Sequence, residues 1–263
     1  MTLPNKQLGQ HWLNDKNSLL AIVDSANVKT GDVVLEIGPG LGSLTQLLID
    51  SGAVVWAIEL DETLSSMLAN RISDPNKKLK VIQQDILKFD FSQLPTNYKI
   101  VANIPYYLTS HLLRILSETI NPPKKAVLLV QKEVAKRVCA IPGDMSLLSV
   151  SVQMYFEVNL GNIVPSNLFI PPPKVDSQIL ILSRLKDPLF GNQDPKDVFR
   201  IVRAGFSERR KKIRSSLSGG LHITKDQADE LLSEAKIDVN FRAQNLNLSD
   251  WLVLTKTWQT FKV

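Results

Sequence analysis

Short apolar runs alternate with stretches of helical periodicity along the first half of the chain. The apolar runs are rich in β-branched and aliphatic residues and have the length of buried strands, at 33–37, 54–58, 79–83, 99–102 and 126–130. Apolar residues recur at helical spacing at 15–27, 44–52, 61–72 and 109–119. Strands that alternate with helices predict right-handed crossovers and a parallel sheet covered on both faces, so we expect a doubly wound α/β domain.

The pattern changes in the second half. Helices are predicted at 131–139 and 147–155, and a late strand at 178–182 follows the proline tract Pro171-Pro172-Pro173. From about Asp194 onward only helical patterns occur, and Gly219-Gly220 interrupts them. We therefore place a first domain at 1–188 and a small all-helical second domain at 189–263.

Composition narrows the class of protein. Of 263 residues, 44% are hydrophobic and 22% are charged, which is ordinary for a globular protein with a full core. The single cysteine excludes an intramolecular disulfide, and three histidines with one thiol show no metal-binding spacing, so we expect no metal cofactor. No stretch approaches the roughly 20 apolar residues of a membrane span, so we expect a cytoplasmic protein without a membrane partner.

The net charge of +5 is concentrated in one segment. Between positions 200 and 214 a single acid, Glu208, stands against seven basic residues: Arg200, Arg203, Arg209, Arg210, Lys211, Lys212 and Arg214. Such a cluster is either a solvated helix face or a surface that displaces counterions from phosphates, which gives affinity for nucleic acid without sequence information.

A glycine-rich turn follows the first predicted strand, in the sequence Glu36-Ile37-Gly38-Pro39-Gly40-Leu41-Gly42. In an open parallel sheet this place borders the ligand crevice. A dinucleotide-binding turn would need a third glycine at position 43, which is Ser43 here. The alternatives are a plain tight turn and a loop for S-adenosylmethionine, with Gly38 beside the methionine and ribose portions.

Two acids follow the next two predicted strands. Glu59 ends the second, where a carboxylate can accept hydrogen bonds from both ribose hydroxyls, and Asp85 follows the third, where it can accept from an adenine amine. Either acid alone could be a solvated strand end or a helix cap. Because three successive strand ends carry suitable groups, we predict an S-adenosylmethionine site.

The strip Asn103-Ile104-Pro105-Tyr106 follows the fourth strand and opens onto the same crevice. An exocyclic aromatic amine is a poor nucleophile because its lone pair is delocalised into the ring. If the Asn103 side-chain oxygen and the Ile104 or Pro105 carbonyl accept its two hydrogens, the lone pair is directed toward the methyl group. Pro105 fixes the backbone, and Tyr106 offers a face on which a flipped-out base can stack. The simpler interpretation is an Asn-Pro turn with a surface tyrosine.

With these motifs the chain resembles the KsgA (RsmA) family of ribosomal RNA adenine dimethyltransferases over nearly its whole length. The residues that carry the resemblance are Leu8-Gly9-Gln10-His11-Trp12-Leu13, Glu36-Ile37-Gly38-Pro39-Gly40, Glu59, Gln84-Asp85, Asn103-Ile104-Pro105-Tyr106, Gln131-Lys132-Glu133-Val134, Phe169-Ile170-Pro171-Pro172-Pro173-Lys174-Val175-Asp176-Ser177 and Arg209-Arg210-Lys211-Lys212. The resemblance implies a Rossmann-like class I methyltransferase domain with a small helical C-terminal domain.

The resemblance also implies roles for individual residues. The N-terminal strip would fold over the cofactor, so that His11 and Leu13 contact S-adenosylmethionine, and Phe169 would sandwich the target adenine with Tyr106. From the sequence alone, His11 is a surface histidine and Phe169 a core residue. Trp12 stands where the family usually has Phe, and Met145-Ser146 where many members have Tyr-Gly.

The implied reaction is transfer of methyl groups from S-adenosylmethionine to N6 of two adjacent adenosines near the 3′ end of small-subunit ribosomal RNA. The implied partner is the 30S particle, with Arg209, Arg210, Lys211 and Lys212 seating a monomeric enzyme on the RNA. Three alternatives remain open. They are an Erm-type enzyme acting on large-subunit RNA, a non-catalytic RNA-binding assembly or transcription factor of the same fold, and a methyltransferase for DNA adenine or protein glutamine.

Overall fold

The computed structural model describes residues 9–261, so Leu8 of the N-terminal strip lies outside the described residues. Contacts divide the chain into two compact units. The first comprises the residues up to Ala135 together with Glu157–Arg184, and the second comprises Lys136–Phe156 and the described part of Leu185–Val263. The sequence predicted one domain boundary, after residue 188. The contacts instead assign the segment Lys136–Phe156 to the unit that contains the C-terminal helices.

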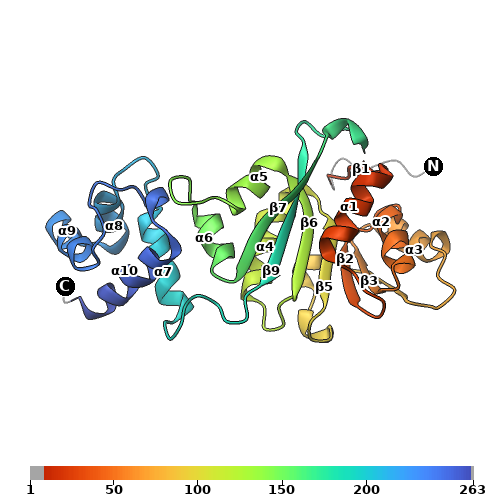
Figure 1. The fold of residues 1–263 in the computed structure, drawn as a ribbon, viewed down its shortest axis with the longest axis horizontal. Coiled ribbons are helices and arrows are strands. Elements are labelled where there is room, and N and C mark those ends of the chain that lie inside the picture. The colour runs from red at the N-terminus through yellow and green to blue at the C-terminus, as the bar shows by residue number, and fades with distance from the viewer. Residues whose placement is uncertain (1–8, 262–263) are drawn as a thin grey trace. The chain divides into compact units, whose positions relative to one another are not determined.

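The first unit contains a seven-stranded sheet in the order β4-β3-β2-β5-β6-β9-β7 (Figure 1). Its strands are β2 Val33–Ile37, β3 Val54–Glu59, β4 Leu79–Gln83, β5 Lys99–Asn103, β6 Lys125–Gln131, β7 Phe156–Val164 and β9 Ser177–Arg184. The strands from β4 to β6 are mutually parallel, and β9 pairs antiparallel with β6. The expected mostly parallel α/β sheet is confirmed.

Three helices connect parallel strands, as the alternating pattern predicts: α2 Ser43–Asp50, α3 Glu62–Arg71 and α4 Thr109–Glu118. Helix α1 Lys16–Ala26 precedes β2, and α5 Lys132–Val138 follows β6. Asp15 and Asp61 cap α1 and α3 by accepting backbone N–H hydrogen bonds. Figure 1 shows α1 on the near side of the sheet and α4 on its far side.

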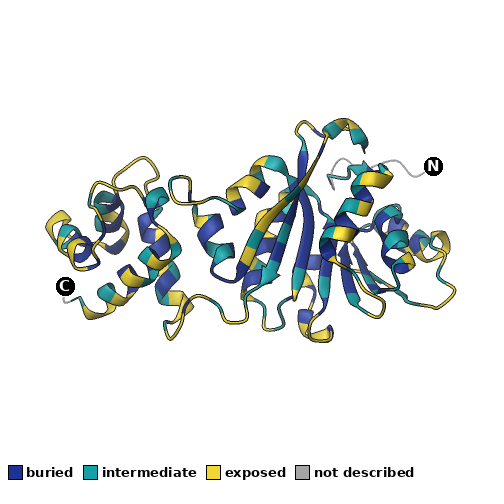
Figure 2. Ribbon diagram, viewed as in Figure 1, coloured by how far each residue is buried: buried dark blue, intermediate teal, exposed yellow. Residues whose placement is uncertain are grey.

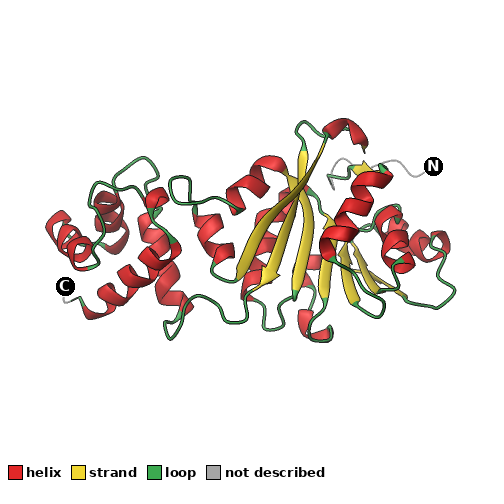
Figure 3. Ribbon diagram, viewed as in Figure 1, coloured by secondary structure: helices red, strands yellow, loops and turns green. Residues whose placement is uncertain are grey.

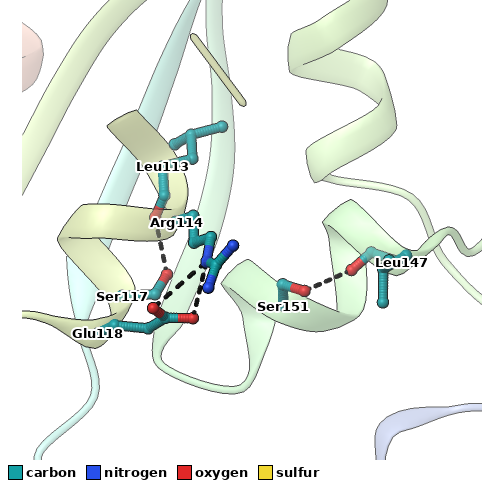
Figure 4. Close-up of polar contacts among 6 residues, drawn as sticks. All are labelled: Leu113, Arg114, Ser117, Glu118, Leu147 and Ser151. Carbon is teal, nitrogen blue, oxygen red and sulfur yellow. Dashed lines mark hydrogen bonds and ion pairs between the residues drawn. The ribbon is translucent and has the colours of Figure 1, made fainter. Parts of the chain in front are cut away.

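The core of the first unit lies where the apolar strands meet these helices (Figure 2). The central strands β2, β5 and β6 are buried along nearly their whole length, which explains why they read as continuous apolar runs and not as alternating ones. Helix α4 shows the complementary pattern, since Leu112, Leu113 and Leu116 are buried while Arg114 and Glu118 form an ion pair on the exposed side (Figure 4).

A second, two-stranded sheet joins distant parts of the first unit. Strand β1, Trp12–Leu13, pairs antiparallel with β8, Phe169–Ile170. Leu13 lies opposite Phe169, and Trp12 lies opposite Ile170. Because neighbouring side chains of a strand point to opposite sides, Leu13 and Phe169 both enter the core, whereas Ile170 is exposed.

The second unit is mainly helical (Figure 3). Its helices are α6 Leu147–Gln153, α7 Pro195–Gly205, α8 Ile213–Leu221, α9 Lys225–Glu234 and α10 Leu248–Thr260. The expected interruption at Gly219-Gly220 is wrong, because α8 runs through both glycines to Leu221, and His222 follows it in a left-handed conformation. Gly220 lies against α7 so closely that a Cβ atom would come within 2.6 Å of the Ala204 Cα. Gly220 therefore allows α7 and α8 to pack closely.

Candidate functional site

A pocket opens at the carboxyl ends of β2, β3 and β5, where the sequence placed the crevice. It is lined by residues from the N-terminal strip, the glycine turn, the ends of the strands and the Asn103 strip. Of the predicted site residues, those on the pocket wall are His11, Leu13, Gly38, Glu59, Asp85, Asn103, Pro105 and Tyr106. The fold therefore brings together residues that are up to 95 positions apart in the sequence, as His11 and Tyr106 are.

The glycine turn is held directly against Glu59. The backbone N–H of Gly40 donates to Glu59 Oε2 over 3.1 Å, and that of Asp61 donates to Glu59 Oε1 over 3.0 Å. Gly38 and Gly40 have φ angles of +65° and +57°, which place the backbone along the pocket wall without a side chain in the way. Glu59 is only 6% exposed, and burial raises its pKa. The carboxylate of Glu59 keeps acceptor capacity for a further donor.

Glu36 is the most deeply buried acid of the pocket, at 1% exposed. Burial, with a smaller contribution from the nearby Glu59 charge, raises its pKa to about 8. Glu36 Oε2 and the indole nitrogen of Trp12 are buried polar atoms without a hydrogen-bond partner among the described residues. Both residues line the pocket, and the Trp12 indole N–H is a buried donor that a polar ligand could satisfy.

Asp85 follows β4 and begins a short helical turn, Ile86–Lys88. One carboxylate oxygen caps this turn by accepting the N–H of Leu87 over 3.0 Å. The cap fixes the side chain at the pocket wall, and the second oxygen is not used by the cap. Asp85 can therefore cap this turn and also accept a hydrogen bond in the pocket, so the two interpretations made from the sequence are compatible.

Asn103 is the last residue of β5, and its orientation is set by the N-terminal strip. Its side-chain nitrogen donates to the backbone oxygen of His11 over 3.2 Å, which leaves the side-chain oxygen available as an acceptor. The Pro105 carbonyl accepts the N–H of Leu108 over 3.0 Å and closes a helical turn, so of the two carbonyls considered, that of Ile104 is the better second acceptor.

Tyr106 is held at both its ring and its hydroxyl. The His11 ring stacks on it with centroids 5.8 Å apart and an interplanar angle of 21°. The Tyr106 hydroxyl lies 2.8 Å from the Ser177 hydroxyl, at the buried start of β9. His11 itself lies with Nδ1 2.7 Å from the Pro171 carbonyl oxygen. The proline tract thus fixes Tyr106 indirectly, through the His11 ring.

Phe169 is the one predicted site residue of the first unit that is not among the residues lining this pocket in the described chain. It is 2% exposed and packs in the core with Leu13, and the ring that stacks on Tyr106 is that of His11. The cause is the β1–β8 ladder, whose register turns Phe169 inward. The expectation from the residues alone, a core phenylalanine, describes this structure; the sandwich with Tyr106 does not.

Ser177 and Tyr107 are site residues for which no role was predicted from the sequence. Ser177 belongs to a quoted motif, but its hydrogen bond to Tyr106 depends on tertiary structure. Tyr107 lines the pocket and is 59% exposed, and a Cβ atom at Gly9 would lie 3.5 Å from its ring. Its position directly after Tyr106 was the only available signal.

The basic residues Arg209, Arg210, Lys211 and Lys212 lie in the second unit and are exposed. They do not form a helix face, because α7 ends at Gly205 and α8 begins at Ile213. The segment between these helices consists of turns, with Lys212 in an extended conformation at the start of α8. Its cations therefore project from a loop between two helices.

Among residues 9–261, no group of three or more His, Cys, Asp or Glu side chains is arranged to hold a metal ion. Within the same range, no helix is long and apolar enough to cross a membrane.

Comparison with known proteins adds independent information. The family model described as ribosomal RNA adenine dimethylase matches residues 1–260. A curated relative from Dehalococcoides mccartyi, named ribosomal RNA small subunit methyltransferase A, is 40% identical over 95% of this chain and 86% of its own. A protein of the same name from Crocosphaera subtropica is 38% identical over 97% of this chain and 98% of its own.

Two solved structures share the fold over almost the whole chain. A dimethyladenosine transferase from Plasmodium falciparum superposes with a TM-score of 0.81 at 28% identity, covering 95% of this chain and 98% of its own. The 23S rRNA methyltransferase ErmE superposes with a TM-score of 0.74 at 26% identity, covering 94% of this chain and 99% of its own.

Proposed function

Because the chain belongs to the ribosomal RNA adenine dimethylase family, we propose that it methylates N6 of two adjacent adenosines near the 3′ end of small-subunit ribosomal RNA, with S-adenosylmethionine as donor. The observation that carries this proposal is the orientation of Asn103. Its nitrogen is engaged by His11, so its oxygen is left to accept a hydrogen bond in the pocket where Glu59 and Asp85 meet.

The pocket residues fit S-adenosylmethionine. Glu59 would accept from the ribose hydroxyls, Asp85 from the adenine amine, and Gly38 would border the methionine portion. Glu36 and Trp12 also line the pocket, where the amino-acid portion of the cofactor would lie beside the glycine turn. His11 and Leu13 complete the wall from the N-terminal strip. When bound, the cofactor supplies a methyl group on a positively charged sulfur.

The chain's own contribution is to orient and activate the amine. The Asn103 side-chain oxygen and the Ile104 carbonyl would accept the two N6 hydrogens, which draws the lone pair out of the ring and toward the methyl group. Tyr106, held by Ser177 and faced by His11, provides an aromatic surface for the base. For the base to stack there, the His11 ring must move or must form the second face.

The small-subunit substrate is favoured over the large-subunit one by degree of similarity. Relatives named for the small subunit are 38–40% identical to this chain, whereas the large-subunit enzyme ErmE is 26% identical. In this proposal Arg209, Arg210, Lys211 and Lys212 contact RNA phosphates of the 30S particle. Their exposure in a loop suits that role, because cations on a projecting loop can reach phosphates.

The test is methyl transfer from labelled S-adenosylmethionine to purified 30S and 50S particles in parallel, followed by mapping of N6,N6-dimethyladenosine. We expect label in the 30S particle, in two adjacent adenosines. Exclusive labelling of the 50S particle would contradict the small-subunit proposal and support an Erm-type activity. Failure to label either particle, with cofactor binding intact, would support a non-catalytic factor.

A further inference from the structure

The ring of His11 covers one face of Tyr106. The two ring centroids are 5.8 Å apart and the ring planes are inclined by only 21°, so the rings stack. Both residues line the pocket together with Asn103, whose side-chain nitrogen donates to the His11 backbone oxygen. A base held by Asn103 would therefore meet Tyr106 where His11 covers it.

His11 is held by two contacts that act on different parts of the residue. Its Nδ1 lies 2.7 Å from the Pro171 carbonyl oxygen, so Nδ1 carries the hydrogen of this bond and the contact holds the ring. Its backbone oxygen accepts from Asn103 over 3.2 Å, and that contact holds only the main chain. The ring can therefore rotate away from Tyr106 about its side-chain bonds while the backbone still orients Asn103.

The two rings leave no room for a base between them. Successive stacked bases lie about 3.4 Å apart, so a base between two rings needs about 7 Å, and the observed separation of the centroids is 5.8 Å. Tyr106 is anchored at its hydroxyl, which lies 2.8 Å from the hydroxyl of the buried Ser177. His11 is thus the ring that has to move.

We propose that His11 is a gate on the site of the target base. Its ring occupies the face of Tyr106 until an adenine displaces it, and its backbone keeps Asn103 oriented throughout. The entering base must offset the loss of the His11–Tyr106 stack and of the hydrogen bond to Pro171. RNA that is also bound elsewhere on the chain can supply this free energy from its remote contacts, whereas a free nucleoside cannot. This inference rests on the proposed function, to which it adds control of access to the stacking site.

The test measures the affinity of the full-length chain for 30S particles with saturating S-adenosylhomocysteine, which has no methyl group to transfer. We expect His11→Ala to bind about two- to tenfold more tightly than the wild type, the range for removal of one competing aromatic pair. His11→Asn, which also lacks an aromatic ring, should bind more tightly too. His11→Phe, which keeps a ring, should bind no more tightly than the wild type. His111→Ala, at an exposed histidine of α4, is the matched control and should bind as the wild type does.

Dependence on Tyr106 separates a gate from a general loosening of the N-terminal strip. In a Tyr106→Ala background, His11→Ala should no longer tighten binding, because the covered face is absent. Equal tightening in both backgrounds would overturn the inference. Unchanged binding by His11→Ala would also overturn it, and so would weaker binding, which would make His11 the second stacking face for the base.

NMR of the chain with isotope-labelled histidine tests the starting contact in the wild type itself. The chain has three histidines. One of their ring signals should be shifted upfield by the ring current of Tyr106, and the shift should disappear in Tyr106→Leu. Absence of such a signal from the wild type would overturn the inference even if the His11 variants did not fold.

Methyl transfer to 30S particles is measured with the same preparation of the wild type. If the wild type transfers methyl groups but His11→Ala does not bind more tightly, the inference fails alone. If the wild type neither binds S-adenosylmethionine nor transfers methyl groups, the proposed function fails, whatever the NMR result.

Discussion

The side-chain nitrogen of Asn103 lies 3.2 Å from the backbone oxygen of His11, which links the end of β5 to the N-terminal strip. An amide has one donor end and one acceptor end, so engaging the nitrogen determines what the oxygen can do. The strip therefore does more than cover the pocket. It selects the orientation in which the Asn103 side-chain oxygen can accept a hydrogen bond.

Asn103→Ala should lower methyl transfer by about two to three orders of magnitude, the range for loss of one preorganised hydrogen bond in an active site. The measurement is labelled methyl incorporation into 30S particles, with RNA affinity determined in parallel and expected to remain. Asn159→Ala, at an exposed position of β7, is the control. Unchanged transfer in Asn103→Ala would refute the role given to this side chain.

The hydrogen bond between Tyr106 and Ser177 should couple the two residues energetically. Tyr106→Phe and Ser177→Ala should each lower the free energy of unfolding by about 1 kcal/mol, and the double variant should cost less than the sum. Urea denaturation of the four proteins measures this cycle. Strict additivity would show that the hydroxyls do not interact in solution.

Two substitutions of Tyr106 separate the role of its ring from the role of its hydroxyl. Tyr106→Phe keeps the stacking face and should alter KM for RNA only a few-fold, whereas Tyr106→Ala removes the face and should raise KM by about tenfold or more. Steady-state kinetics on 30S particles distinguishes the two. Equal kinetics for Phe and Ala would exclude a stacking role for this ring.

Glu36 should make the stability of the ligand-free protein depend on pH. Its pKa is about 8 in the folded chain against an ordinary value of 4.5, so the folded state holds this proton to higher pH than the unfolded state does. The contribution is therefore complete below about pH 4.5 and is lost as the pH rises to about 8. Glu36→Gln does not titrate, so its melting temperature relative to wild type should rise over this interval. Parallel curves for the two proteins would contradict the raised pKa.

Gly42 and Gly31 form a natural comparison. Both have positive φ, +86° and +88°, but a Cβ at Gly42 would lie 2.7 Å from Ile72 Cδ1, whereas one at Gly31 would meet nothing within 4 Å. Gly31→Ala should cost about 1 kcal/mol of backbone strain, and Gly42→Ala that strain and a further 1–3 kcal/mol, roughly, for overpacking. Chemical denaturation measures the difference, and equal losses would mean that the Ile72 side chain adapts freely.

Sequence periodicity predicted the central parallel strands well because β2, β5 and β6 are buried along nearly their whole length and so form apolar runs of their own. Strand β7 was not predicted, because it is an edge strand whose middle residues, including Leu160 and Ile163, are exposed and show no clear alternation. The two-residue strands β1 and β8 exist only through their mutual pairing, and no local pattern can indicate that.

The residues of the candidate site also differ in whether the sequence could predict them. Glu59, Asp85 and Asn103 could be predicted because each ends or follows a recognisable strand, and strand ends of a parallel sheet converge on one edge. Phe169 and the His11 ring could not be placed from the sequence, because their positions depend on the register of the β1–β8 ladder. Gly219-Gly220 misled for a related reason, since only the approach of α7 explains glycines within α8.

Pairing of β1 with β8 also has a consequence for biosynthesis. Leu13 leaves the ribosome early, but its partner Phe169 belongs to the last part of the first unit to be translated. The N-terminal strip therefore stays unpaired while the parallel strands are translated. The pocket wall that it forms is complete only after the proline tract has been translated. A nascent chain stalled before that tract would carry the glycine turn, Glu59 and Asn103 without the ladder that holds His11 over them.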